Sequence, residues 1–312
     1  MTKLKPQDVI IAVVLLSIVL IIILPVPTAL MDVLLVVNIA ISLLVLLMTV
    51  YITEPLQFAS FPTMLLILTL FRLSLNISTT SLILGNNGDA GRVIRTFAQF
   101  VIGDNLVVGV ITFFIIVIVQ FVVITKGAER VAEVAARFTL DAMPGKQMAI
   151  DADLNSGLID EQGAKERRAK IQREADFYGA MDGSSKFVKG DAVVGILITL
   201  VNIVGGLIIG LVGDSGMTTA EVIDTYLIAA VGDGLCSQIP ALMVSTAMGI
   251  IVTRATSDNN LGRDLAKQFG SQPYIFIILA CMLLGFAIIP GMPTLPILFL
   301  AAGLGALAYF LL

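Results

Sequence analysis

The chain has 312 residues, of which 57% are hydrophobic and only 13% are charged. Ordinary globular domains carry roughly 25% charged residues. With a mean hydropathy of +0.99, this chain holds more apolar surface than a soluble fold of its length can bury, whereas a bilayer solvates such surface readily. The composition therefore excludes an ordinary soluble protein and indicates an integral membrane protein.

Charge and residue types narrow the function further. The net charge is −4, and most charged residues lie between Lys126 and Asp191, so no basic patch indicates nucleic-acid binding. The chain has no histidine, and Cys236 and Cys281 lie in separate apolar stretches without a CxxC motif. We expect no metal site or cofactor, and both cysteines as buried packing. Without a phosphate loop or a Ser/His/Asp set, we also expect that the chain is not an enzyme.

Apolar segments predict the fold class. A transmembrane helix needs about 20 mostly apolar residues, and eight segments approach or reach that length. We place them at Val9–Leu24, Val33–Val50, Phe58–Leu84, Val101–Ile124, Ala192–Val212, Tyr226–Thr253, Tyr274–Pro290 and Pro293–Leu312. The sequence therefore predicts an all-α polytopic membrane protein with eight transmembrane helices.

The basic residues predict the orientation, because Lys and Arg resist translocation. If the N-terminus is cytoplasmic, nearly all of the basic residues fall in cytoplasmic segments, beginning with Lys3 and Lys5. The opposite face then keeps only Arg92 and Arg95, and Arg72 lies within a span. We expect both termini on the cytoplasmic side.

The chain divides into three parts on this basis. Residues 1–125 carry spans one to four, residues 126–190 form a small cytoplasmic subdomain, and residues 191–312 carry spans five to eight. Within the subdomain, a short helix is predicted at Ala128–Phe138, and Pro144-Gly145 is expected to end it or turn the chain. A second helix is predicted at Asp160–Phe177.

An apparent calcium motif in this subdomain is rejected. Asp151, Asp153 and Asn155 have the spacing of the first three EF-hand ligands. The required glycine is displaced to Gly157, and the twelfth position is Gln162 and not Glu. We therefore predict no calcium site.

Arg72 lies near the middle of the third span. A central Arg is disfavoured by about 2.5–3.5 kcal/mol on insertion scales, so it should face protein or water and have a partner. Asn76 lies one turn later on the same face. The pattern favours a functional or assembly role, and a structural buried pair or a displaced span remains the alternative.

Asp233 lies between two glycines in the sixth span. Gly232 and Gly234 flank it and Pro240 follows, a pattern that weakens a helix at the charge, as in broken helices at ion sites. Such a carboxylate could carry protons. The alternative is a kink at which Asp233 caps the broken end.

Lys186 and Asp191 come directly before the fifth span. Their spacing is typical of a juxtamembrane anchor with Asp191 as an N-cap or first-turn acid, and their place at a cytoplasmic mouth also fits an entry point for protons. Spacing leaves both interpretations open. Within the same span, Gly206 and Gly210 form a GxxxG motif that favours close helix approach.

Five stretches resemble one known family. They are Arg130–Asp153, Glu174–Gly183, Lys186–Asp191, Gly232–Pro240 and Phe71–Asn76, and the likeness extends over essentially the whole chain. Together they resemble the FHIPEP family, the flagellar, hypersensitive-response and invasion protein export pores. The amino-acid sequence is more similar to the flagellar branch of the family than to the injectisome branch.

The resemblance implies a function. Members of this family form the export gate of type III secretion in the bacterial inner membrane, assemble as a homo-nonameric ring with other membrane components, and couple the proton motive force to protein export. A large cytoplasmic domain after the last span docks substrates and chaperones, so we expect one beyond Leu312. The resemblance assigns the proton or ion pathway to Arg72, Lys186, Asp191 and Asp233. The family's signature loop corresponds to Arg137, Asp141, Pro144, Gly145, Lys146 and Asp151.

Two other functions remain open from the residues alone. Asp233 on a broken helix also fits an ion channel or small-solute transporter, although no internal repeat relates spans one to four to spans five to eight. A passive scaffold whose intramembrane charges specify assembly is the third possibility.

Overall fold

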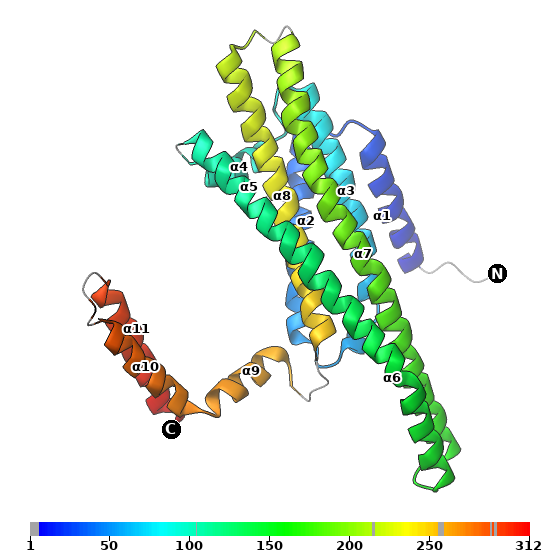
Figure 1. Ribbon diagram of the computed structural model, residues 1–312. Coiled ribbons are helices and arrows are strands. Elements are labelled where there is room, and N and C mark those ends of the chain that lie inside the picture. Colours follow the sequence, from blue (N-terminus) through cyan, green and yellow to red (C-terminus); the bar gives the residue numbers. More distant parts are fainter. Residues whose placement is uncertain (1–5, 104, 214–215, 255–258, 288, 290–291) are drawn as a thin grey trace, which may run out of the picture. The chain divides into compact units, whose positions relative to one another are not determined.

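The computed structural model describes residues 6–103, 105–213, 216–254, 259–287, 289 and 292–312, and all regular secondary structure within them is helical (Figure 1). Two compact units are present. One comprises Met1–Thr49 and Glu54–Ala255, and the other Val50–Thr53 and Thr256–Leu312.

The helices follow one another with short connections. The first unit contains α1 (Pro6–Ile23), α2 (Thr28–Tyr51), the 3₁₀ turn η1 (Pro55–Phe58), α3 (Phe61–Gly85), α4 (Arg92–Ile102), α5 (Leu106–Val122), the π-helical segment η2 (Val123–Ala128), α6 (Glu129–Asn155), α7 (Glu161–Val212) and α8 (Thr219–Thr253). The second contains α9 (Leu261–Gly270), α10 (Pro273–Ala287) and α11 (Thr294–Leu311).

Several helices are long and apolar enough to cross a membrane. Among the described residues there are five, α2, α3, α7, α8 and α11, or up to seven if the bent pairs α4 with α5 and α9 with α10 each count as one span. The apolar stretch of α1, Val9–Ile23, is shorter. Each of the eight expected segments overlaps a helix, but the count of eight stays a prediction. Lys3, Lys5 and Pro290 lie outside the described residues.

Helix α7 corrects the expected organisation of the cytoplasmic subdomain. The sequence predicted one helix ending at Phe177 and a separate span beginning at Ala192, whereas α7 runs without a break through 52 residues, about 78 Å. The glycines at 179, 183 and 190 do not end it, because buried Phe177, Met181 and Val188 continue one packed face at helical spacing. The small subdomain is thus a helical hairpin built on α7.

Helix α6 corrects a second expectation. Pro144 and Gly145 were predicted to end a helix or turn the chain, but both lie inside α6. Proline removes one backbone hydrogen bond and bends a helix without necessarily ending it. The helix instead ends at Asn155, where Gly157 takes a φ of +74°, and Asp160 caps α7 by accepting from the Gly163 backbone N–H at 2.7 Å.

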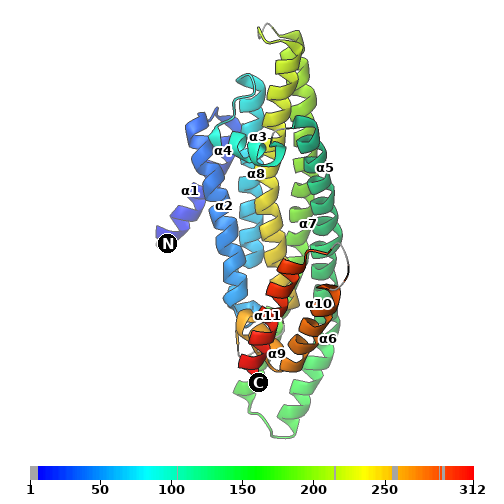
Figure 2. The ribbon, with the colours of Figure 1, turned by 90° about the vertical axis from the view of Figure 1, so that its left-hand side faces the viewer.

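Ion pairs join the two helices of this hairpin in a constant antiparallel register. Lys146 Nζ lies 2.7 Å from Glu174 Oε2, and Arg167 Nη1 lies 2.9 Å from Asp153 Oδ2. Near the tip, buried Ile150, Ala164 and Ile171 form a small apolar cluster. The hairpin thus has its own core, with α6 and α7 side by side in both views (Figures 1 and 2).

The centre of the first unit is formed by α3, α7 and α8, which run side by side (Figures 1 and 2). The GxxxG glycines explain the close approach of α7 to α8. A Cβ on Gly206 would lie 2.3 Å from Cδ1 of Tyr226, and one on Gly210 would lie 2.4 Å from a methyl group of Val222. The expected role of this motif in close packing is confirmed.

Helix α4 packs against α8 beside Asp233. The carboxylate of Asp32 on α2 accepts hydrogen bonds from the backbone N–H groups of Arg92 at 3.0 Å and Val93 at 2.9 Å, which satisfies the first turn of α4. A Cβ on Gly232 would lie 2.2 Å from the carbonyl oxygen of Ile94. Only glycine at position 232 allows this contact.

Candidate functional site

Arg72 and Asp191 form a buried ion pair between α3 and α7. Nη2 of Arg72 contacts Oδ2 of Asp191, and the two side chains keep only 4% and 2% of their exposure. The partner that Arg72 requires is therefore Asp191. The interpretation of Asp191 as an N-cap or first-turn acid is wrong, because Asp191 lies far inside α7, whose N-cap is Asp160.

A cavity adjoins this pair between α3, α5, α7 and α8. Its volume is about 20 Å³, enough room for about one water molecule. Its polar lining consists of Arg72, Asn76, Gln120, Asp191, Ser237 and Gln238. Charged and uncharged polar groups thus meet inside the helical core.

Asp233 forms a second buried polar site on α8. Its side chain is buried, and Oδ2 accepts a hydrogen bond of 2.9 Å from Nδ2 of Asn202 on α7, which is fully buried. The hydroxyl of Thr79 on α3, which donates to the Asn76 carbonyl at 3.0 Å, also lies beside the Asp233 side chain. All three central helices therefore contribute to the environment of this carboxyl group.

The helix around Asp233 is not broken. Helix α8 continues through Gly232, Gly234 and Pro240 to Thr253, so the expectations of a broken helix and of Asp233 as its cap are both wrong. The glycines serve close packing instead, since a Cβ on Gly234 would lie 2.6 Å from the ring of Phe113.

The two sites are stacked along the same helices. Asn202 follows Asp191 by three helical turns on α7, about 16 Å along the axis, and both side chains are buried. On α8, Ser237 lines the cavity one turn after Asp233. A column of polar groups therefore runs through the centre of α3, α7 and α8.

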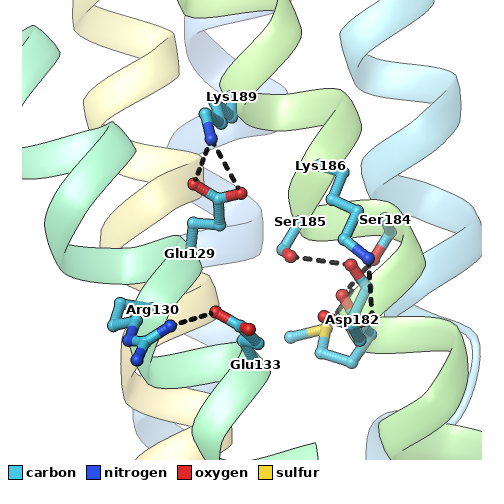
Figure 3. A network of polar contacts seen from close by, with 9 residues as sticks. Glu129, Arg130, Glu133, Asp182, Ser184, Ser185, Lys186 and Lys189 are labelled. Atoms are coloured by element: carbon cyan, nitrogen blue, oxygen red, sulfur yellow. Dashed lines mark hydrogen bonds and ion pairs between the residues drawn. The ribbon is translucent and has the colours of Figure 1, made fainter.

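Several ion pairs lie where α6 and α7 leave the apolar region (Figure 3). We call this part of the hairpin, residues 129–133 of α6 and 182–189 of α7, the neck. Nζ of Lys189 on α7 lies 3.0 Å from Oε2 of Glu129, the first residue of α6. On α6, Arg130 pairs with Glu133 at 2.9 Å. The Glu129 side chain keeps 17% of its exposure, so this bridge joins the two helices at a position that is only partly exposed to solvent.

Lys186 lies outside the buried site. Its ammonium group pairs with Asp182 one turn earlier at 3.0 Å, and its side chain is 63% exposed. The hydrogen bond to Asp182 and the negative charges of Asp182, Glu133 and Glu129 raise the pKa of Lys186 above its ordinary value. Lys186 therefore stays protonated at neutral pH. Of the four pathway candidates, only Arg72 and Asp191 are in contact with each other.

Comparison with known proteins decides the family. A sequence profile of the FHIPEP family matches residues 18–312. The chain belongs to the FHIPEP family. It is 51% identical over 307 residues to low calcium response locus protein D of Yersinia pestis (98% of this chain, 43% of that protein). It is 56% identical over 277 residues to flagellar biosynthesis protein FlhA of Bacillus subtilis (87% and 41%), and 50% identical over 307 residues to protein MxiA of Shigella flexneri (98% and 44%). No solved structure matches.

The residues that the resemblance assigns to a signature loop all lie in α6, within the α6–α7 hairpin. Arg137 and Asp141 are exposed and lie 3.8 Å apart on successive turns of α6. Lys146 pairs with Glu174, and Asp151 contacts Arg168.

In the part of the chain that the structure describes, no three His, Cys, Asp or Glu side chains gather so as to hold a metal ion. Of the two cysteines expected to be buried, Cys236 is buried and Cys281 is exposed.

Sequence reasoning missed three residues that belong to the polar column, namely Asn202, Gln120 and Gln238. Asn202 is an amide inside an otherwise apolar run, three turns after Asp191, a spacing that places the two on one helix face. Gln120 and Gln238 are likewise single amides in apolar segments, Gln120 near the end of its segment and Gln238 near the middle. An isolated amide at helical spacing from a carboxylate was the available signal.

Proposed function

We propose that this chain is the membrane portion of a type III export gate and couples the proton motive force to protein translocation across the bacterial inner membrane. It acts as a transport component and not as an enzyme. The observation that carries the proposal is the buried Arg72–Asp191 pair, stacked with buried Asp233 at the centre of an FHIPEP chain. Buried ionisable groups within membrane spans are rare and mark ion pathways.

In the proposed cycle, Asp191 and Asp233 accept and release protons. Protonation of Asp191 removes the negative charge that neutralises Arg72, so the contact between α3 and α7 weakens. Deprotonation restores the pair. Because the pair joins two long helices, one of which continues into the cytoplasmic hairpin, a proton step at the pair can move the hairpin. Lys186 lies at the neck and contributes a positive charge near Glu129 and Glu133 of α6.

The proposed setting is a homo-oligomeric ring, nonameric as in the family, surrounded by other membrane components of the apparatus. Eight spans with both termini in the cytoplasm place the α6–α7 hairpin on the cytoplasmic side. The chain spans about two fifths of the length of the curated relatives it matches. Exported subunits and their chaperones would dock on a cytoplasmic domain that follows the last span.

We place the chain in a flagellar apparatus, where it would export flagellar subunits. The 56% identity to FlhA of Bacillus subtilis supports this placement. The injectisome is the alternative, supported by 51% identity to low calcium response locus protein D over a larger part of the chain. Restored motility in a strain lacking FlhA would support the flagellar placement. Restored effector secretion alone, in a strain lacking its injectisome relative, would contradict it.

The proton-coupling part is tested by Asp191→Asn and Asp233→Asn in a strain that depends on this protein for export. Both variants should stop export while membrane insertion and ring assembly stay intact. Asp224→Asn is the matched control, since Asp224 is exposed on the same helix as Asp233. Normal export in both variants would remove the proton-coupling proposal. Failure of the variants to assemble would favour a scaffold, and free passage of small ions without exported protein would favour a channel.

A further inference from the structure

Three buried oxygen atoms beside the Arg72–Asp191 pair receive no hydrogen bond from the described part of the protein. They are Oδ1 of Asp191 on α7, Oε1 of Gln120 on α5 and Oε1 of Gln238 on α8. All three side chains line the same cavity. A buried acceptor without a donor is destabilising, and native proteins pair nearly all of them. Nη2 of Arg72 lies at the same cavity, has no hydrogen bond there either and makes its contact with Oδ2 of Asp191. The remaining acceptors therefore indicate donors from a bound molecule.

The charges around the cavity decide what that molecule is. The guanidinium of Arg72 already lies there and disfavours a metal cation, while one carboxylate and two amide oxygens disfavour an anion. Among the described lining residues, Arg72 and Asp191 are the ionisable ones; α5 contributes Gln120, and α8 contributes Ser237 and Gln238. Water fits both the polarity and the space, about 20 Å³, and its two O–H groups serve two of the three acceptors at a time.

We propose that this cavity binds water and that Gln120 and Gln238 are positioning residues that hold it against Oδ1 of Asp191. This inference rests on the proposed function for its proton step. The bound water passes a proton to Oδ1 of Asp191 and is reprotonated in the same step by a hydronium ion from the aqueous side, so that one proton moves, neutral water remains and no group is oxidised. When Asp191 is protonated, Arg72 keeps an uncompensated charge, which the two amide oxygens stabilise.

The π-helical segment η2 agrees with this role. It follows α5 directly, beginning three residues after Gln120, and leads into α6. A π-turn shifts the register of the helix after it relative to the helix before it, and such turns are frequent at functional sites. In this chain the segment separates Gln120, which lines the cavity, from Glu129, which pairs with Lys189.

The site is tested by a cryo-EM map of the protein in lipid, at a resolution that shows ordered water, together with proton flux in proteoliposomes. We expect density for water within hydrogen-bonding distance of Asp191 Oδ1 and of at least one of the two amide oxygens. Gln120→Met and Gln238→Met, which keep side-chain length without the amide, should lose that density and lower proton flux about tenfold, the usual weight of one hydrogen bond. Gln120→Asn and Gln238→Asn should recover part of the flux.

Gln99→Met is the matched control, since Gln99 is exposed on α4 away from this cavity, and it should keep wild-type flux. A dry cavity, or amide groups turned out of it, would overturn the inference. Wild-type flux in both methionine variants would also overturn it and leave the proposed function intact. Ordered water in a protein that conducts no protons would support the binding site and contradict the proposed coupling instead.

Discussion

The Arg72–Asp191 pair yields the sharpest prediction about stability. We consider Arg72→Met, Asp191→Asn and the double variant. Both side chains are almost fully buried, with 4% and 2% of their exposure left, so the screening that makes surface ion pairs weak does not apply. Each single variant leaves one buried polar partner without its counterpart, and the loss should be about 3–5 kcal/mol.

The double variant should lose much less than the sum of the two single losses. Two unit charges at 4 Å attract by about 4 kcal/mol at an effective dielectric constant of 20. Because removing both partners also removes the unpaired charge, the coupling energy of the cycle should be at least about 2 kcal/mol. The double variant should therefore be more stable than the worse single variant, even though export is lost in all three.

Thermal unfolding in detergent, followed by tryptic cleavage or by a thiol probe on buried Cys236, measures the cycle. The control is Lys146→Met with Glu174→Gln, an ion pair with side-chain exposures of 47% and 24%, whose coupling should stay below about 1 kcal/mol. Additive effects of Arg72→Met and Asp191→Asn would refute the buried pair.

Three further variants test other contacts. Gly206→Ala would place a Cβ 2.3 Å from the Tyr226 ring and should destabilise by about 1–3 kcal/mol; Tyr226→Ala should then recover part of the loss in thermal unfolding, and no loss would contradict the close packing. Asn202→Leu removes the donor to Asp233 and should destabilise by about 1–3 kcal/mol, whereas unchanged unfolding would count against this hydrogen bond. Pro144→Ala should stabilise α6 by up to about 3 kcal/mol, visible as slower amide exchange in the middle of that helix; faster exchange would indicate that α6 ends there.

The sequence predicted those features that depend on composition and on energetic necessity. A 312-residue chain with 57% hydrophobic residues can satisfy its backbone in lipid only as helices or a closed barrel, and the apolar lengths favoured helices. Arg72 required a partner because its span surrounds it with apolar residues. The identity of that partner was not predictable, since it depends on the relative rotation and height of α3 and α7.

The missed features depend on tertiary packing. Glycines at 179, 183 and 190 and Pro144 are local helix-weakening signals, and packing of α6 against α7 overrides them through the Lys146–Glu174 pair and the buried face of α7. Around Asp233, the same glycines that suggested a broken helix allow α4 and α5 to approach α8. A glycine in a membrane helix indicates either a break or a close contact, and only the positions of neighbouring helices distinguish the two.

The central claim is that buried carboxylates in the α3–α7–α8 core carry protons for export. Its most direct test measures proton uptake and protein translocation together in inverted membrane vesicles under an imposed proton gradient. The account predicts that Asp191→Asn abolishes both signals while the ring remains assembled. Translocation at the wild-type rate by this variant, with or without proton uptake, would contradict it.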